Sequence, residues 1–143
     1  MLSQTAEYAL RAVVALAAKP DTPFTTKRLA EETQVPSPYL SKVLQALARA
    51  DLVKSQRGLH GGFVLARAAG EVTLLDVINA VDPIRAIESC PLNLKQHGAN
   101  LCPLHSRINA TILMMRDVFK SSTIEEILQE DSTSKPLCES GPS

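Results

Sequence analysis

The chain has 143 residues, 45% of them apolar, and a formal net charge of zero. This length suits one domain, or a small domain with an added dimerisation element, and the apolar share excludes a disordered chain. Because tryptophan is absent and only 3% of the residues are aromatic, aliphatic side chains have to build the core, which favours helices.

The N-terminal stretch "MLSQTAEYALRAVVALAAKPD" is predicted to be a helix of the mature protein. It has polar and acidic residues early and no basic leader region, unlike a signal peptide. No apolar run reaches the roughly 18 residues that a membrane span needs. Three cysteines, an odd number, argue against a secreted disulfide framework. We therefore expect a cytoplasmic protein without membrane association, whose thiols stay reduced.

The first fifty residues predict three helices. "SQTAEYALRAVVALAA" has helical apolar spacing and is expected to begin with Ser3 or Thr5 as its N-cap. "TTKRLAEETQ" predicts a short second helix, capped by one of its two leading threonines. The third helix, in "SPYLSKVLQALARADL", is expected to start with Ser37 as N-cap and Pro38 in the first helical position.

The segment after the third predicted helix loses the helical spacing of apolar residues. Two short apolar runs flank the glycine-rich "RGLHGG", which predicts a β-hairpin. "TLLDVINAVDP" predicts a short helix that opens with a capping box of Thr73 and Asp76 and ends at Pro83.

A long amphipathic helix is predicted in "PLHSRINATILMMRDVFKS". Its apolar stripe, with spacings of three and four, consists of Leu104, Ile108, Ile112, Met115 and Phe119. A capping box of Ser122 and Glu125 is expected to open a last short helix, "TIEEILQE".

This order of elements predicts a mainly α fold, a winged helix-turn-helix. In that fold the third helix enters the DNA major groove, and an arginine on a slim hairpin tip reaches the minor groove or the phosphates. The candidate DNA-contacting residues are Thr26, Ser37, Pro38, Tyr39, Ser41, Lys42 and Gln45 in the helices and Arg57, Gly58 and His60 in the hairpin. Residues 1–67 carry nine basic and five acidic side chains, and residues 68–143 carry six and ten. A basic front half fits DNA binding, although a small helical module whose hairpin merely turns the chain has the same pattern.

Three stretches, "EYALRAVVALA", "SPYLSKVLQALARADLVKSQRGLHGGFVLAR" and "TLLDVINAVD", resemble the IscR/NsrR-type winged-helix transcription regulators, the Rrf-two family. The resemblance covers residue 1 to roughly residue 130. It implies a homodimer that binds a palindromic double-stranded DNA operator, usually as a repressor. The expected organisation is a winged domain in residues 1–83, a sensor loop in 84–103, dimerisation helices in 104–130 and a flexible tail in 131–143.

The loop "CPLNLKQHGANLCPLH" carries the sensor in many members of that family, as an iron–sulfur cluster that responds to nitric oxide, iron or redox state. The IscR-like pattern is C-x5-C-x5-C-x2-H, and Cys90, Cys102 and His105 match it, whereas Gln96 stands where the middle cysteine belongs. Some relatives take a carboxylate from the first helix of the other protomer, which implies the partner subunit's Glu7 as a fourth ligand. Two thiolates with a histidine and a carboxylate favour a 2Fe–2S over a 4Fe–4S cluster.

Other interpretations of the loop stay open. His97 could fill the gap beside Gln96, or no cluster binds and the regulator is a thiol switch or responds to a small ligand. A zinc site would lack a second ligand pair, Cys90 and Cys102 could form a disulfide, and His105 could hydrogen-bond locally.

The chain contains no phosphate loop, GxSxG, HExxH or paired-carboxylate signature, so we expect no enzyme. A protein–protein adaptor built on the winged fold is the remaining rival.

Overall fold

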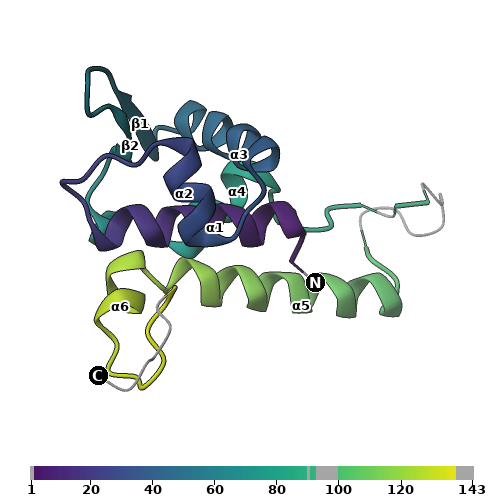
Figure 1. The fold of residues 1–143 in the computed structure, drawn as a ribbon. Coiled ribbons are helices and arrows are strands. Elements are labelled where there is room, and N and C mark those ends of the chain that lie inside the picture. Colours follow the sequence, from purple (N-terminus) through teal and green to yellow (C-terminus); the bar gives the residue numbers. More distant parts are fainter. Residues whose placement is uncertain (1, 90, 93–99, 138–143) are drawn as a thin grey trace.

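The computed structural model describes residues 2–89, 91–92 and 100–137. Its elements in chain order are α1 Gln4–Ala18, α2 Thr26–Thr33, α3 Ser37–Arg49, β1 Val53–Gln56, β2 Gly62–Leu65, the short 3-10 helix η1 Ala69–Glu71, α4 Leu74–Val81, α5 Pro103–Lys120 and α6 Ile124–Gln129. Figure 1 shows α1 at the centre, with α3 and the hairpin on one side and the long helix α5 on the opposite side. Among the described residues, none of the helices is long and apolar enough to cross a membrane.

The core is aliphatic, as the composition predicts, and it forms around α1. This helix packs against α2, α3, α4 and α6. The stripe Leu40, Val43, Leu44 and Leu47 of α3 is buried against it. Because α1 contacts four other helices, the first four helices and α6 form one head, hereafter the winged head.

Two predicted helix starts are confirmed in detail. The Ser3 hydroxyl accepts a hydrogen bond from the Ala6 N–H at 3.1 Å, so Ser3 rather than Thr5 caps α1. Thr73 and Asp76 each accept a hydrogen bond from the other's backbone N–H, at 3.1 and 3.0 Å, which completes the predicted capping box of α4.

Two other predicted caps are wrong by one residue. The N-cap of α3 is Pro36, whose side chain has no hydrogen-bond acceptor. Its carbonyl accepts the first helical bonds, from the N–H groups of Tyr39 and Leu40, so Ser37 lies inside the helix. The last capping box is Thr123 with Glu126. Thr123 pairs with Thr73 in an isolated antiparallel bridge, and this pairing holds it extended and shifts the cap away from Ser122.

The predicted hairpin is confirmed, and we call it the wing. Its strands pair antiparallel from Val53 opposite Leu65 to Gln56 opposite Gly62. The wing is fastened to the head by a backbone bridge between Phe24 and Phe63, with N–O distances of 3.0 and 2.7 Å. The segment before α2 therefore sets the direction in which the wing points.

We expect Gly62→Ala to destabilise the protein by about 2–3 kcal/mol. A Cβ at this position would lie 2.5 Å from the carbonyl carbon and oxygen of Phe24, so the bridge to the wing would have to open. Thermal unfolding should show a fall in Tm of roughly 6–10 °C. The control is Gly58→Ala, because both glycines have a positive φ, +125° at Gly58 and +157° at Gly62, whereas a Cβ on Gly58 would meet no atom within 4 Å. An equal fall in Tm in the two variants would show that the Phe24–Phe63 bridge does not stabilise the protein.

The long helix α5 is fixed to the winged head most firmly at its C-terminal end. There Ile124, which follows it, is completely buried, and the Thr73–Thr123 bridge joins the two segments. Nearer its N-terminal end, the Asn109 side chain accepts a hydrogen bond from the Ile87 N–H at 2.8 Å. None of the side chains of α5 is fully buried, so this helix lies on the head rather than inside it.

Candidate nucleic-acid interface

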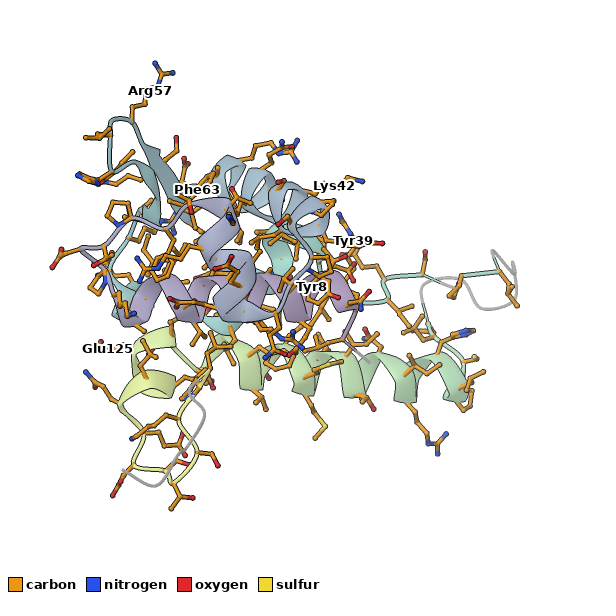
Figure 2. All side chains as sticks on the ribbon, viewed as in Figure 1. Tyr8, Tyr39, Lys42, Arg57, Phe63 and Glu125 are labelled. Atoms are coloured by element: carbon orange, nitrogen blue, oxygen red, sulfur yellow. The ribbon has the colours of Figure 1, made fainter. Side chains whose placement is uncertain are left out.

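The predicted DNA-contacting residues of α3 share one exposed face. Because the buried stripe of α3 points to α1, the opposite side of the helix faces outward (Figure 2). Its exposed residues are Ser37, Pro38, Tyr39, Ser41, Lys42, Gln45 and Arg49. Arg49 is not among the predicted contacts, although its spacing of four from Gln45 and seven from Lys42 places it on the same side. Thr26, the first residue of α2, is half-buried.

The wing tip presents a second set of predicted contacts. Arg57, Gly58 and His60 are all exposed, and Leu59 between them is 95% exposed. The Gly61 N–H donates to the Gly58 carbonyl at 3.1 Å and closes the tip. Figure 2 shows Arg57 and Lys42 on the side of the winged head that faces away from α5. One DNA duplex could therefore meet the wing and α3 together.

The cations on this face are available to phosphates. The ion pairs between described residues join Arg11 to Glu7 and join Lys19 and Arg28 to Glu32. Lys42, Arg49 and Arg57 take part in none of these pairs. Unpaired exposed cations next to polar side chains suit the phosphate contacts that position a protein on DNA.

The described part of the cysteine loop places two predicted ligands side by side. Cys102 is the N-cap of α5, and its Sγ lies 3.3 Å from Nδ1 of His105, one turn along the helix. Both side chains are half-buried. A thiol and an imidazole together fit part of an iron–sulfur or zinc ligand set. In the described ranges no group of three or more His, Cys, Asp or Glu side chains gathers as a metal site.

The remaining predicted ligands are not brought to this pair. Cys90, like Gln96 and His97, lies outside the described residues. Glu7 accepts a hydrogen bond from Arg11 at 3.2 Å, and Arg11 also donates to the Thr33 carbonyl at 3.3 Å. The role of Glu7 as a ligand for the other protomer stays a prediction, and it would require this exposed ion pair to open.

The predicted stripe of α5 forms one helical face, but its members differ in exposure. Ile112, Met115 and Phe119 are half-buried on the side of the winged head, so part of their surface is covered by packing within the protomer. The other stripe members are exposed, together with two residues outside the stripe. This outer face of α5 consists of Leu104 (63% exposed), Ile108 (41%), Met114 (69%) and Val118 (63%).

Comparisons with known proteins agree with this geometry. The family model Rrf2, described as an iron-dependent transcriptional regulator, matches residues 2–130. A protein of Aquifex aeolicus described as an HTH-type transcriptional regulator is 29% identical over 131 residues, which are 90% of this chain and 91% of that protein. The oxidised form of Staphylococcus aureus CymR has a TM-score of 0.71 at 26% identity and covers 93% of this chain and 99% of its own. T. potens IscR, with a TM-score of 0.75 at 24% identity over 92% of this chain and 93% of its own, shares the fold.

An exposed α3 beside a basic wing defines the class of winged helix-turn-helix DNA-binding transcription regulators. The proteins that this chain is similar to are regulators and not enzymes. With the family model matching residues 2–130, the chain belongs to the Rrf2 family of transcriptional regulators.

Proposed function

We propose that this chain is a cytoplasmic homodimeric repressor whose affinity for a palindromic operator depends on the state of the Cys90–His105 loop. The main support for the DNA contact is that Lys42, Arg49 and Arg57 are exposed on one face and take no part in the ion pairs described above. In this proposal the N-terminal half of α3 contacts base edges in the major groove, and the wing contacts the minor groove or its phosphates.

The outer face of α5 supports the proposed dimer. Four large apolar side chains on one side of an exposed helix form a patch that monomeric proteins seldom present to water. A second copy of the same helix is the self-complementary partner that two-fold symmetry provides. The dimer would carry two α3 helices, which have to lie about 34 Å apart to meet successive major grooves.

The proposed sensor is an iron–sulfur cluster that takes Cys102 and His105 as ligands, with Cys90 and the partner subunit's Glu7 completing the set. Support comes from the 3.3 Å contact of Cys102 with His105 and from the iron-dependent description of the family. Such a cluster supplies a one-electron redox centre, and a 2Fe–2S type suits this mixed donor set best. Because Cys102 is the N-cap residue of α5, ligation of its sulfur would act directly on the N-terminus of the helix that forms the proposed dimer.

A thiol switch without a cluster is the second candidate. The similarity to S. aureus CymR, which has been solved in an oxidised form, favours this alternative, and so does Gln96 at the expected cysteine position. Oxidation of Cys102 would then take the place of cluster loss, since its sulfur is half-exposed at the helix start.

The loop is tested by preparing the protein without oxygen and measuring iron, sulfide and visible absorbance. We expect a coloured protein whose iron content falls to background in Cys102→Ser, because one thiolate ligand is lost, whereas Cys138→Ser in the tail keeps its iron. Air exposure should change operator affinity in a gel shift by roughly 5–150-fold, the usual range of coupling between sites.

The outcomes of this experiment separate the two candidates. Iron-free protein whose DNA affinity still changes on oxidation, and no longer does so in Cys102→Ser, would establish the thiol switch and exclude the cluster. An iron-free protein with the same DNA affinity before and after oxidation would contradict both sensors and leave the DNA-binding proposal standing.

A further inference from the structure

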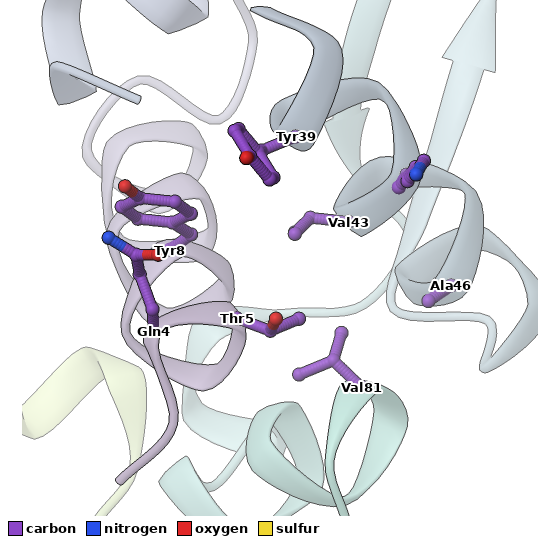
Figure 3. A pocket seen from close by; sticks show the side chains of 8 residues that line it. Gln4, Thr5, Tyr8, Tyr39, Val43, Ala46 and Val81 are labelled. Atoms are coloured by element: carbon purple, nitrogen blue, oxygen red, sulfur yellow. The ribbon is translucent and has the colours of Figure 1, made fainter. Parts of the chain in front are cut away.

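A cavity of about 230 Å³ lies between the start of α1, the first part of α3 and the end of α4. It is lined by Gln4, Thr5, Tyr8, Tyr39, Lys42, Val43, Ala46 and Val81. Figure 3 shows Thr5, Val43 and Val81 pointing into the space beside the two tyrosine rings. The chain has only two tyrosines and no tryptophan, so all of its long-wavelength aromatic residues line this one cavity.

The shape of the cavity suits a flat apolar group. The ring centroids of Tyr8 and Tyr39 are 6.3 Å apart with a 55° angle between their planes, which makes an aromatic corner. Val43 is buried, and Ala46 and Val81 are half-buried, so the rest of the wall is largely aliphatic. Because an apolar protein cavity of about 150 Å³ can hold benzene, this volume suits a single ring with a short side chain.

The charge of the cavity suits an anion. Lys42 carries the only formal charge among the lining side chains, and Gln4 and Thr5 add neutral hydrogen-bonding groups. Glu7 does not line the cavity and is paired with Arg11. A ligand with one carboxylate would therefore pair with Lys42 without meeting an acidic side chain in the lining.

We propose that this cavity binds a small aromatic monocarboxylate, and that the bound ligand weakens DNA binding. The coupling rests on the proposed function, whereas ligand binding itself does not. Lys42 and Tyr39, which is 58% exposed, belong both to the cavity and to the exposed face of α3. A ligand carboxylate on Lys42 removes a cation from the DNA contact and places a negative charge close to the phosphates.

Tyrosine fluorescence tests the binding step, because the signal comes only from Tyr8 and Tyr39. Titration of the full-length chain with phenylacetate should give a saturable change with a dissociation constant on the order of 0.1–1 mM, as expected for about ten non-hydrogen atoms. Phenylacetamide, which lacks the charge, and acetate, which lacks the ring, should bind about tenfold or more weakly. Absence of a saturable change with phenylacetate, or an equal response to acetate, would overturn the proposal.

Two substitutions locate the site. Ala46→Leu fills the cavity and should weaken phenylacetate binding about tenfold or more, whereas Ala110→Leu, exposed on α5, should not alter it. Tyr8→Leu removes one ring, leaves Tyr39 as the reporter and should also weaken binding. Circular dichroism confirms that each variant is folded, and unchanged binding in both cavity variants would place the ligand elsewhere and refute the assignment.

Operator binding with and without saturating phenylacetate tests the coupling. We expect affinity to fall about fivefold or more, with no such fall in Ala46→Leu. If phenylacetate binds and DNA affinity is unchanged, the coupling is refuted. If the chain binds no DNA in any condition, the proposed function fails, and the fluorescence titration still decides whether the ligand site exists.

Discussion

Replacing both Met114 and Val118 by glutamate should convert the proposed dimer into a monomer. These two side chains are 69% and 63% exposed on the outer face of α5, so their replacement should leave the winged head folded. The new carboxylates cannot be buried between two copies of the helix, so the dimer should not form. Sedimentation or light scattering at micromolar concentration measures the mass. A monomer holds one half-site instead of two, so operator affinity should fall by roughly 10²–10⁴-fold.

The matched control for this prediction places the same two charges on the other side of α5. Ser106 and Leu113 are seven residues apart and exposed, and helical geometry turns them away from Leu104 and Val118. Ser106→Glu with Leu113→Glu should remain dimeric and bind the operator normally. A dimer that survives Met114→Glu with Val118→Glu would show that the copies meet through another surface.

Removing Lys42 and Arg57 together should weaken operator binding about 10–100-fold and flatten its salt dependence. Each cation that neutralises one phosphate contributes about 0.9 to the steepness of log K against log salt concentration. The slope of the double alanine variant should therefore be shallower by roughly 1.8 per protomer. Fluorescence anisotropy with labelled operator across several salt concentrations gives both quantities.

The control for the charge prediction removes two cations from other parts of the surface. Lys120 lies at the end of α5 and Lys135 in the segment after α6, and both are exposed. The double variant Lys120→Ala with Lys135→Ala has the same net charge as the Lys42 and Arg57 variant, so bulk electrostatics are matched. Equal losses of affinity in the two variants would argue that the α3 and wing face is not the DNA-binding surface.

Local sequence patterns predict the winged head well, because its helices and hairpin depend on short-range signals. The stripe of α3 follows helical spacing, and the glycine-rich turn fixes the wing. The cap of α3 is predicted at Ser37, but the helix begins one residue earlier, after Pro36, which offers no side-chain cap. The cap at Ser122 is misplaced because Ser122 and Thr123 can both serve, and a distant contact decides between them. For the last helix that contact is the bridge of Thr123 to Thr73.

The candidate sites are less predictable from sequence than the fold. Periodicity predicts one apolar stripe on α5, but it cannot tell how far along the helix the winged head covers that stripe, so the predicted stripe contains both the half-buried Ile112 and the exposed Leu104. The aromatic cavity has no local signature, since Tyr8 and Tyr39 meet only when α1 packs on α3. In contrast, the proximity of Cys102 and His105 follows from their spacing of one helical turn.

The position of Cys102 at the N-terminus of α5 makes this helix the route by which a change at the sulfur would reach the proposed dimer. The 18 residues of α5 span about 27 Å, and Ile112, Met115 and Phe119 pack on the winged head along the second half of this length. The first turns, with the exposed Leu104 and Ile108, precede this packing. In the proposed dimer, ligation or oxidation of Cys102 would therefore shift these first turns and the contact between protomers, while α3, on the other side of α1, keeps its place.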